Sequence, residues 1–380
     1  MSILSPFESN FATTLFALVT PIPLENCMSL SRSCRGLLNL HHRSNLACFA
    51  RNQSQSHNRR NMAKKKAPIP ESHLILPTHS TSQTASIVDT HTHIASTFEA
   101  YRHKYKEGKF ETVFDFIKGV TANRNVDAVV DVWCEAPIRK LWKEFADSAV
   151  TEEDRIKNWG GLEYWFVMGV HPHEAKHYTD EVEEELLQAM EHPRCVGWGE
   201  MGLDYHYDLS PRDVQQAVFT RQLKHAVRLG KPLTIHTREA NEDTERILKE
   251  EVPKDHKIHI HCFTDEPAFA LRLLEHFSNL YIGVTGVVTY TSNENTSGAV
   301  YQMSQGSSDN LRILLETDAP YMVPANIYDT LTTIKGKLPI CHTAMIPWTA
   351  DFVANFLGGE WTSEKVMKIS RENARSVYGV

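Results

Sequence analysis

The sequence of 380 residues lacks several features that would assign its class at once. Its seven cysteines are odd in number and include no C-x-x-C pair, which argues against a disulfide framework and favours a reducing compartment. No apolar run reaches the roughly 20 residues that a membrane span requires. No G-x-G-x-x-G motif follows the first predicted strand, which disfavours a doubly wound dinucleotide-binding sheet.

Acidic residues are scarce near the N-terminus and abundant in the rest of the chain. Residues 1–88 carry nine Lys and Arg but only three Asp and Glu, whereas the remainder carries 31 basic and 44 acidic residues. The acidic body lacks the basic surface expected of a nonspecific, high-affinity DNA binder. If its substrate is a polyphosphate chain, we expect bound cations to help to hold it.

Residues 1–85 show no sustained periodicity and are rich in Ser, Asn, Arg and Pro, so we expect a disordered or targeting leader. The stretch 28–61 has repeated arginines and no acidic residue, as in a mitochondrial transit peptide. Met62 offers an alternative start that would remove this stretch. We therefore expect the protein in the cytoplasm, the nucleus or both, with the mitochondrion as the alternative.

From residue 86 onward, short apolar and β-branched runs alternate with stretches of helical spacing. Their near-continuous apolar character is typical of parallel strands covered on both faces. The predicted strands are 86–93, 127–133, 164–173, 195–204, 232–239, 257–264, 280–286 and 312–320.

The helical stretches between these runs follow the usual start and stop signals. The clearest has Ser210 placed as its N-cap, Pro211 in its first turn and Gly230 after its end. Residues 266–277 and 363–379 have the same apolar spacing. Eight strand–helix alternations predict an α/β fold, a (β/α)₈ TIM barrel over 86–380, with a doubly wound open sheet as the second choice.

In such a barrel the chemistry lies at the carboxyl ends of the strands. Two histidines in an H-x-H pattern point to the same side of the first strand, so both imidazoles can reach one ion. Other strand ends supply further imidazoles and carboxylates, which suit Zn²⁺, Mn²⁺ or Mg²⁺. The predicted metal ligands are His91, His93, Glu200, His236, His261 and Asp318.

Six ligands exceed one closed tetrahedral site, so we expect two divalent metal ions with Glu200 as the bridging carboxylate. Two ions about 3.5–4 Å apart stabilise both the attacking and the leaving oxygen of a phosphoryl displacement. Asp318 and Glu200 are the predicted catalytic residues, with Asp318 as the general base.

Four further polar residues lie at the same strand ends. We expect His171 and His173 to contact substrate, although both could also be ligands or merely packed polar groups. Arg238 points to the same side as His236, and its planar guanidinium suits a phosphate. Asp204 is expected to orient a ligand or the substrate. By contrast, His256 and His259 are expected in a loop and facing outward.

Seven segments together resemble the TatD-type metal-dependent DNases of the amidohydrolase-like TIM barrels. They are "DTHTH" (89–93), "GVHPH" (169–173), "GEMGLDY" (199–205), "IHTREA" (235–240), "HCFT" (261–264), "ETDAPY" (316–321) and "ENARSVYG" (372–379). The resemblance covers about residues 86–380. It implies a two-metal site on the six residues named above and hydrolysis of DNA phosphodiesters, often by 3′-exonuclease action.

The sequence departs from the family around its substrate-handling segments. Asp265 replaces a usual glycine, and residues 94–119 lengthen the first strand–helix loop over the site. The Arg-Asn pair that the family commonly has after "ETDAPY" is missing, and Lys335, Lys337 and His342 are the nearest candidates for its role.

These departures leave three functions open. We expect a metal-dependent deoxyribonuclease with DNA as its substrate and no membrane association. The alternatives are a metal-dependent hydrolase of another ester or amide, and a barrel retained mainly to bind a protein partner of unknown identity.

Overall fold

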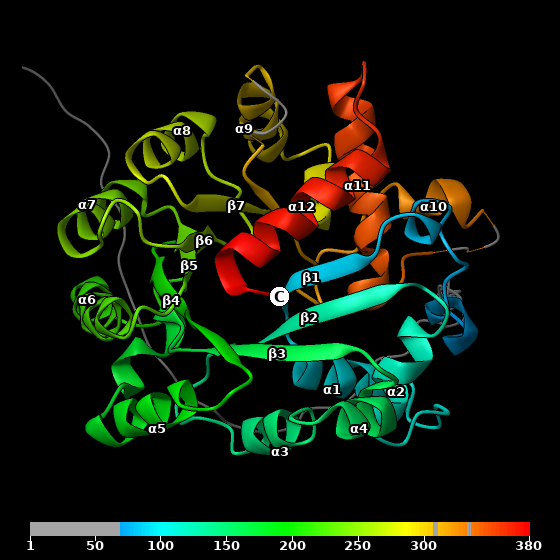
Figure 1. The fold of residues 1–380 in the computed structure, drawn as a ribbon, viewed down its shortest axis with the longest axis horizontal. Helices are drawn as coiled ribbons and strands as arrows, with labels where there is room; N and C mark the ends of the chain where they lie inside the picture. The colour runs from blue at the N-terminus through cyan, green and yellow to red at the C-terminus, as the bar shows by residue number, and fades with distance from the viewer. Residues whose placement is uncertain (1–68, 307–310, 333, 335) are drawn as a thin grey trace, which may run out of the picture. The chain divides into compact units, whose positions relative to one another are not determined.

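The computed structural model describes residues 69–306, 311–332, 334 and 336–380 of the chain. In these residues eight parallel strands form one sheet in the order in which they follow one another in the sequence, and helices surround them (Figure 1). The strands are β1 (Ile87–Thr92), β2 (Val126–Trp133), β3 (Glu163–Met168), β4 (Cys195–Asp204), β5 (Leu233–Arg238), β6 (Ile258–Ile260), β7 (Leu280–Val284) and β8 (Ile313–Leu315).

At least one helix follows every strand. The helices are α1 (Ile94–Lys104), α2 (Val113–Thr121), α3 (Leu141–Asp147), α4 (Glu152–Asp154), α5 (Asp180–Met190), α6 (Arg212–Leu229), α7 (Asn241–Glu251), α8 (Pro267–His276), α9 (Asn295–Ser304), α10 (Ile327–Thr330), α11 (Ile346–Leu357) and α12 (Ser363–Tyr378).

The last strand returns beside the first, so the sheet nearly closes into a barrel. The Thr90 hydroxyl donates to the Leu315 carbonyl at 3.1 Å. Just beyond the strand ends, the Asp318 amide donates to the His91 carbonyl at 2.9 Å, and the His93 amide to the Ala319 carbonyl at 3.0 Å. These bonds confirm the predicted (β/α)₈ barrel, and all eight predicted strands are present.

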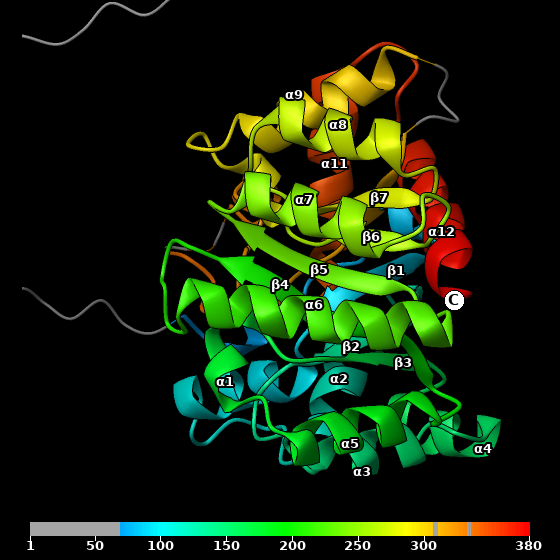
Figure 2. The same cartoon turned by 90° about the vertical axis from the view of Figure 1, so that its left-hand side faces the viewer.

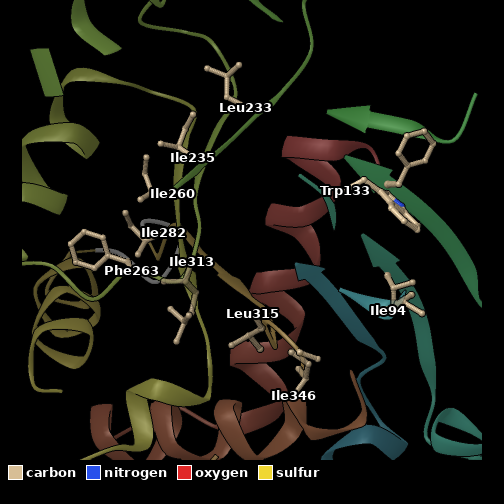
Figure 3. Packing of buried hydrophobic residues seen from close by; sticks show 14 of the residues in the cluster. Ile94, Trp133, Leu233, Ile235, Ile260, Phe263, Ile282, Ile313, Leu315 and Ile346 are labelled. Atoms are coloured by element: carbon tan, nitrogen blue, oxygen red, sulfur yellow. The ribbon is translucent and has the colours of Figure 1, made fainter. Parts of the chain in front are cut away.

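The outer faces of the strands pack against the helices in rows set by the strand register. Ile235, Ile260, Ile282 and Ile313 are register partners across β5 to β8, and all four are fully buried (Figure 3). Burying one such side chain stabilises the fold by about 1.5–3 kcal/mol relative to leaving it exposed. These rows hold the strands in the register that brings their polar ends together.

Helix α12 covers the amino-terminal ends of the strands. In Figure 2 the strand arrows point away from it. The Ser370 hydroxyl accepts from the Leu315 amide at 2.7 Å. The Tyr378 hydroxyl reaches the barrel interior, 2.7 Å from Thr234 Oγ1 and 2.9 Å from His259 Nδ1. The opposite, carboxyl ends of the strands therefore remain for a functional site.

Residues 69–85 differ from the expectation of a disordered leader, because they pack against the barrel. Leu74 and Leu76 are buried, and the Leu74 carbonyl accepts from His342 Nε2 at 3.0 Å. The Tyr105 hydroxyl donates to the Ile69 carbonyl at 3.0 Å. The expected boundary at residue 85 was thus wrong for this stretch, while residues 1–68 lie outside the described part of the chain.

Two local expectations were also wrong. The Ser210 hydroxyl does not cap α6, because it donates to the His173 carbonyl at 2.8 Å and Pro211 occupies the N-cap position. His259 faces the barrel interior rather than outward and is fully buried, since it alternates with the outward Ile258 and Ile260. No helix in the described residues is long and apolar enough to span a membrane.

Candidate metal centre

The first group of donors lies where β1 meets the loop after β8. The Nε2 atoms of His91 and His93 are 3.3 Å apart. Oδ1 of Asp318 lies 3.8 Å from Nε2 of His91 and 3.4 Å from Nε2 of His93. Asp318 has a φ of 50°, a left-handed conformation that an L-residue adopts at a cost and that directs its carboxylate toward the two imidazoles. These three residues can converge on one ion.

The second group of donors comes from β4, β5 and the end of β6. Oε1 of Glu200 lies 2.8 Å from Nδ1 of His236 and 2.7 Å from Nε2 of His261. The same two imidazole nitrogens are 3.0 Å apart. The carboxyl-terminal parts of these strands therefore bring these three predicted ligands together as well.

Glu200 lies between the two groups. Its Oε1 faces His236 and His261, whereas its Oε2 lies 3.6 Å from Nε2 of His91 and 3.9 Å from Nε2 of His93. Gly199 permits this placement, because it has a φ of 151° and a Cβ there would lie 2.3 Å from the Thr234 carbonyl oxygen. The backbone of β4 can thus approach β5 closely enough for the carboxylate to meet both groups.

The donor set fits divalent cations. Imidazole and carboxylate donors about 2.1 Å from one ion stand roughly 3–3.4 Å apart, close to several of the spacings here. Glu200 is only 3% exposed, and among the described residues neither Glu200 nor Asp318 forms an ion pair with Lys or Arg. Buried carboxylates need a compensating positive charge, which a metal ion supplies.

Electrostatics within the cluster differ between neighbouring histidines. Burial lowers the pKa of His91 to about 3, so its imidazole is neutral, which is the form that binds a cation. Burial also opposes the charged form of His93, but the Asp318 hydrogen bond and carboxylate outweigh it and raise its pKa to about 9. Burial opposes ionisation of Glu200, but the surrounding His261 and His171 imidazoles hold its pKa well below the usual range.

The four residues predicted to contact substrate surround the second donor group. Nε2 of His171 lies 3.4 Å from Oε1 of Glu200, close enough for His171 to join Glu200 and His236 around one ion. Oδ2 of Asp204 lies 2.8 Å from Nε2 of His173 and 3.3 Å from Nε2 of His236. Nη1 of Arg238 is 3.9 Å from the same oxygen, and its guanidinium carbon lies 5.3 Å from the centre of the Tyr207 ring.

Sequence reasoning missed a buried polar layer beneath the donors. Oε2 of Glu316 lies 2.9 Å from Nε2 of His259, and Glu316 also comes near His91 and His261. Both residues could have been found from the two-residue period of a strand, because each stands two positions before a predicted ligand, Asp318 or His261.

Asp89 and Asp131 are buried supports that the sequence did not single out as such. Asp89 accepts from the Thr317 amide at 3.0 Å and from the Thr317 and Thr343 hydroxyls at 2.6 and 2.8 Å. Asp131 accepts from the Ile94 amide at 2.8 Å and from the Tyr164 hydroxyl at 2.9 Å. Asp89 therefore fixes β1 to the segment before Asp318, and Asp131 fixes the chain just after His93.

The candidates for the missing Arg-Asn pair take different places. His342 is 2% exposed and hydrogen-bonded to the Leu74 carbonyl, so its candidacy for substrate contact was wrong. Lys337 lines a hollow beside Pro320 and Tyr321 at the barrel mouth. Lys335 lies outside the described residues.

Comparison with known proteins identifies a family that matches most of this chain. The model of the TatD related DNase family matches residues 88–379. The human protein named 3′-5′ RNA nuclease TATDN2 is 35% identical over 266 residues, which cover 69% of this chain but only 31% of that protein. The match therefore spans about a third of the human relative.

A bacterial relative and a solved structure extend the comparison. The 3′-5′ ssDNA/RNA exonuclease TatD of Pantoea ananatis is 32% identical over 219 residues, covering 57% of this chain and 78% of that protein. The crystal structure of an uncharacterized amidohydrolase from Saccharomyces cerevisiae superposes with a TM-score of 0.62 at 18% identity, over 77% of this chain and 100% of that one. This structural likeness supports the barrel fold.

Proposed function

The chain belongs to the TatD related DNase family, and from this membership we propose that it is a metal-dependent nuclease that removes nucleotides from the 3′ end of single-stranded DNA or RNA. The observation that carries the proposal is the placement of Glu200, whose two carboxylate oxygens face two separate groups of donors. The names of the human and Pantoea relatives, a 3′-5′ RNA nuclease and a 3′-5′ ssDNA/RNA exonuclease, support the substrate class and the direction.

Two divalent ions, Mg²⁺, Mn²⁺ or Zn²⁺, fit the two donor groups. His91, His93 and Asp318 would hold one ion with Oε2 of Glu200, and His236 and His261 the other with Oε1. His171 is close enough to complete the second set. When bound, such ions polarise a phosphoryl oxygen, acidify water and stabilise the leaving oxygen.

The chain's own residues then position the phosphodiester and accept a proton. Asp318 can act as the general base, because its carboxylate is held at the first donor group by its backbone conformation. Arg238 is one-third exposed and presents a guanidinium that can orient a non-bridging phosphate oxygen. Asp204 holds His173 and His236 in fixed orientations.

The proposal is tested with the full chain, stripped of metal and then given Mn²⁺, Mg²⁺ or Zn²⁺. Single-stranded DNA and RNA oligonucleotides labelled at the 5′ end report stepwise shortening from the 3′ end as a ladder. We expect metal-dependent cleavage that is lost in the His91→Ala/His93→Ala double variant. His177 is exposed and His276 is half-buried, and both lie outside the donor groups, so the His177→Ala/His276→Ala double variant is a matched control that should retain activity.

Two results would count against the proposal in different ways. A protein that binds metal but leaves both nucleic acids intact acts on another ester or amide. Cleavage that persists in the His91→Ala/His93→Ala variant would instead remove the proposed centre from the reaction.

A further inference from the structure

Two hollows meet at Tyr321 on the rim of the barrel mouth. The first has a volume of about 620 Å³ and includes Tyr290, Tyr321, Tyr328 and Lys337 in its lining. The second has a volume of about 710 Å³ and lies between Tyr321 and the C-terminal end of α1, where His103 and Lys104 line it. Tyr321 therefore lines two neighbouring spaces of the size that binds small ligand groups.

Tyr321 is fixed relative to the proposed metal ligand Asp318. The Tyr321 amide donates to the Asp318 carbonyl at 3.0 Å, which closes a tight turn. The intervening residues are held from both sides, because the Ala319 carbonyl accepts from the His93 amide at 3.0 Å and the Pro320 carbonyl from the Cys341 amide at 2.9 Å. A group bound against Tyr321 therefore lies one tight turn away from the proposed metal ligand Asp318.

The three tyrosines of the first hollow differ in what their hydroxyls do. Tyr290 donates to the Val323 carbonyl at 3.0 Å, and the Tyr328 hydroxyl accepts from the Leu338 amide at 2.7 Å. Tyr321 is 63% exposed, and its hydroxyl has no hydrogen-bond partner among the described residues. Two rings therefore form a fixed wall, while the third offers a face to solvent.

The charge around Tyr321 favours an anionic occupant. Among the described residues that line the first hollow, Lys337 alone is charged. In the second hollow, Lys104 and His103 accompany one acid, Glu99, which is paired with Arg139. A further hollow on the Arg238 side is lined instead by three acids, Glu239, Asp265 and Glu266. A phosphate chain is repelled less on the Tyr321 side.

We propose that Tyr321 stacks against an unpaired base of the substrate strand, whose scissile phosphate lies at the metal donors and whose neighbouring phosphates face Lys337 and Lys104. This assignment rests on the proposed nuclease function. Base–aromatic stacking requires a base that is not already stacked in a duplex, and it tolerates any sequence because every base has a π-face. The Tyr321 subsite therefore selects single strands.

The test compares Tyr321→Ala, Tyr321→Phe and a matched control, Tyr301→Ala, which removes a 48% exposed tyrosine from α9. KM and kcat are measured with the full chain and Mn²⁺ on a single-stranded oligonucleotide. A second series carries one abasic nucleotide at successive positions from the 3′ end. Loss of one stacking contact raises KM by about tenfold or more. We expect this rise in Tyr321→Ala and little change in Tyr321→Phe or Tyr301→Ala.

The abasic series identifies the contact itself. The intact protein should show a raised KM when one particular base is missing, and Tyr321→Ala should be indifferent to the loss of that same base. Cleavage with an unchanged KM in Tyr321→Ala, or an abasic penalty that persists in it, overturns the stacking assignment and leaves the nuclease function standing. An intact protein that binds Mn²⁺ but cleaves no oligonucleotide overturns the proposed function and the subsite together.

Discussion

Nε2 of His259 and Oε2 of Glu316 lie 2.9 Å apart inside the barrel, and both side chains are fully buried. The pair stands between the metal donors above and α12 below, since Glu316 lies close to His91 and His261 while His259 contacts the Tyr378 hydroxyl. The C-terminal helix is thereby connected to the floor of the proposed metal centre through the Tyr378–His259 hydrogen bond and the His259–Glu316 contact.

Removing the Tyr378 hydroxyl should destabilise the barrel. Tyr378→Phe leaves Thr234 Oγ1 and His259 Nδ1 without their partner at 2.7 and 2.9 Å, and a buried polar group without a partner costs about 1–3 kcal/mol. Urea unfolding of the metal-free protein measures the change. Tyr301→Phe, at an exposed tyrosine, is the control and should leave the free energy of unfolding unchanged. Equal stability of the two variants would contradict the role given to Tyr378.

Replacing Asp204 should weaken metal binding without abolishing the fold. Its Oδ2 accepts from Nε2 of His236, which fixes the ring so that Nδ1 faces Glu200. Loss of such a carboxylate behind a metal-binding histidine typically costs 10–100-fold in affinity. Calorimetric titration of the metal-free Asp204→Asn variant with Mn²⁺ should show this loss of affinity. Asp208→Asn, at an exposed carboxylate that pairs only with Arg212 among the described residues, should bind as the intact protein does.

His342 should make the stability of the protein depend on pH. Burial lowers its pKa to about 4, below the ordinary value of 6.5, so the folded state binds fewer protons than the unfolded state between these values. Its contribution to stability is full above pH 6.5 and falls by about 1.4 kcal/mol per pH unit as the pH drops toward 4.

The His342→Gln variant isolates this contribution, because Gln can still donate to the Leu74 carbonyl but does not titrate. The free energy of unfolding is compared at pH 7.5 and 5. The intact protein should lose about 2 kcal/mol more than the variant over this interval. An equal decrease in the free energy of unfolding of the two proteins would show that His342 is not the titrating group.

Metal removal should lower the melting temperature. The donors belong to the folded barrel, and ligand at 100 times its dissociation constant stabilises the folded state by about 2.7 kcal/mol. Thermal unfolding of the chelated protein should therefore shift upward when Mn²⁺ returns. Adding Mn²⁺ should leave the melting temperature of the His91→Ala/His93→Ala variant unchanged. An equal upward shift in that variant would show that the stabilising ions bind outside the proposed centre.

The barrel and the meeting of the six predicted metal ligands could be predicted from the sequence, because both follow from regular patterns of apolar and polar residues along the chain. Apolar runs of strand length mark β1 to β8, and a polar residue at the end of a run marks a position at the barrel mouth. His91, His93, His236 and Asp318 all follow this rule. Glu200 stands within β4, and the structure shows why it still reaches the centre: Gly199 lets β4 pass close to β5.

The remaining differences concern contacts between segments far apart in the sequence. Leu74 and Leu76 are too few to mark residues 69–85 as folded, and only the surface of the barrel gives them a place to pack. Ser210 has the composition of a helix cap but bonds to His173, which a local rule does not consider. His259 lies on the same side as His261, and its outward assignment ignored the two-residue period.

The most direct test of the account is the electron paramagnetic resonance spectrum of the full chain loaded with Mn²⁺, together with the number of ions bound per chain. Two ions bridged by Glu200 and about 3.5–4 Å apart should give a spin-coupled spectrum at two Mn²⁺ per chain. Glu200→Gln should lose that coupling. A single Mn²⁺ per chain with an uncoupled six-line spectrum would contradict the bridged centre on which the proposed mechanism rests.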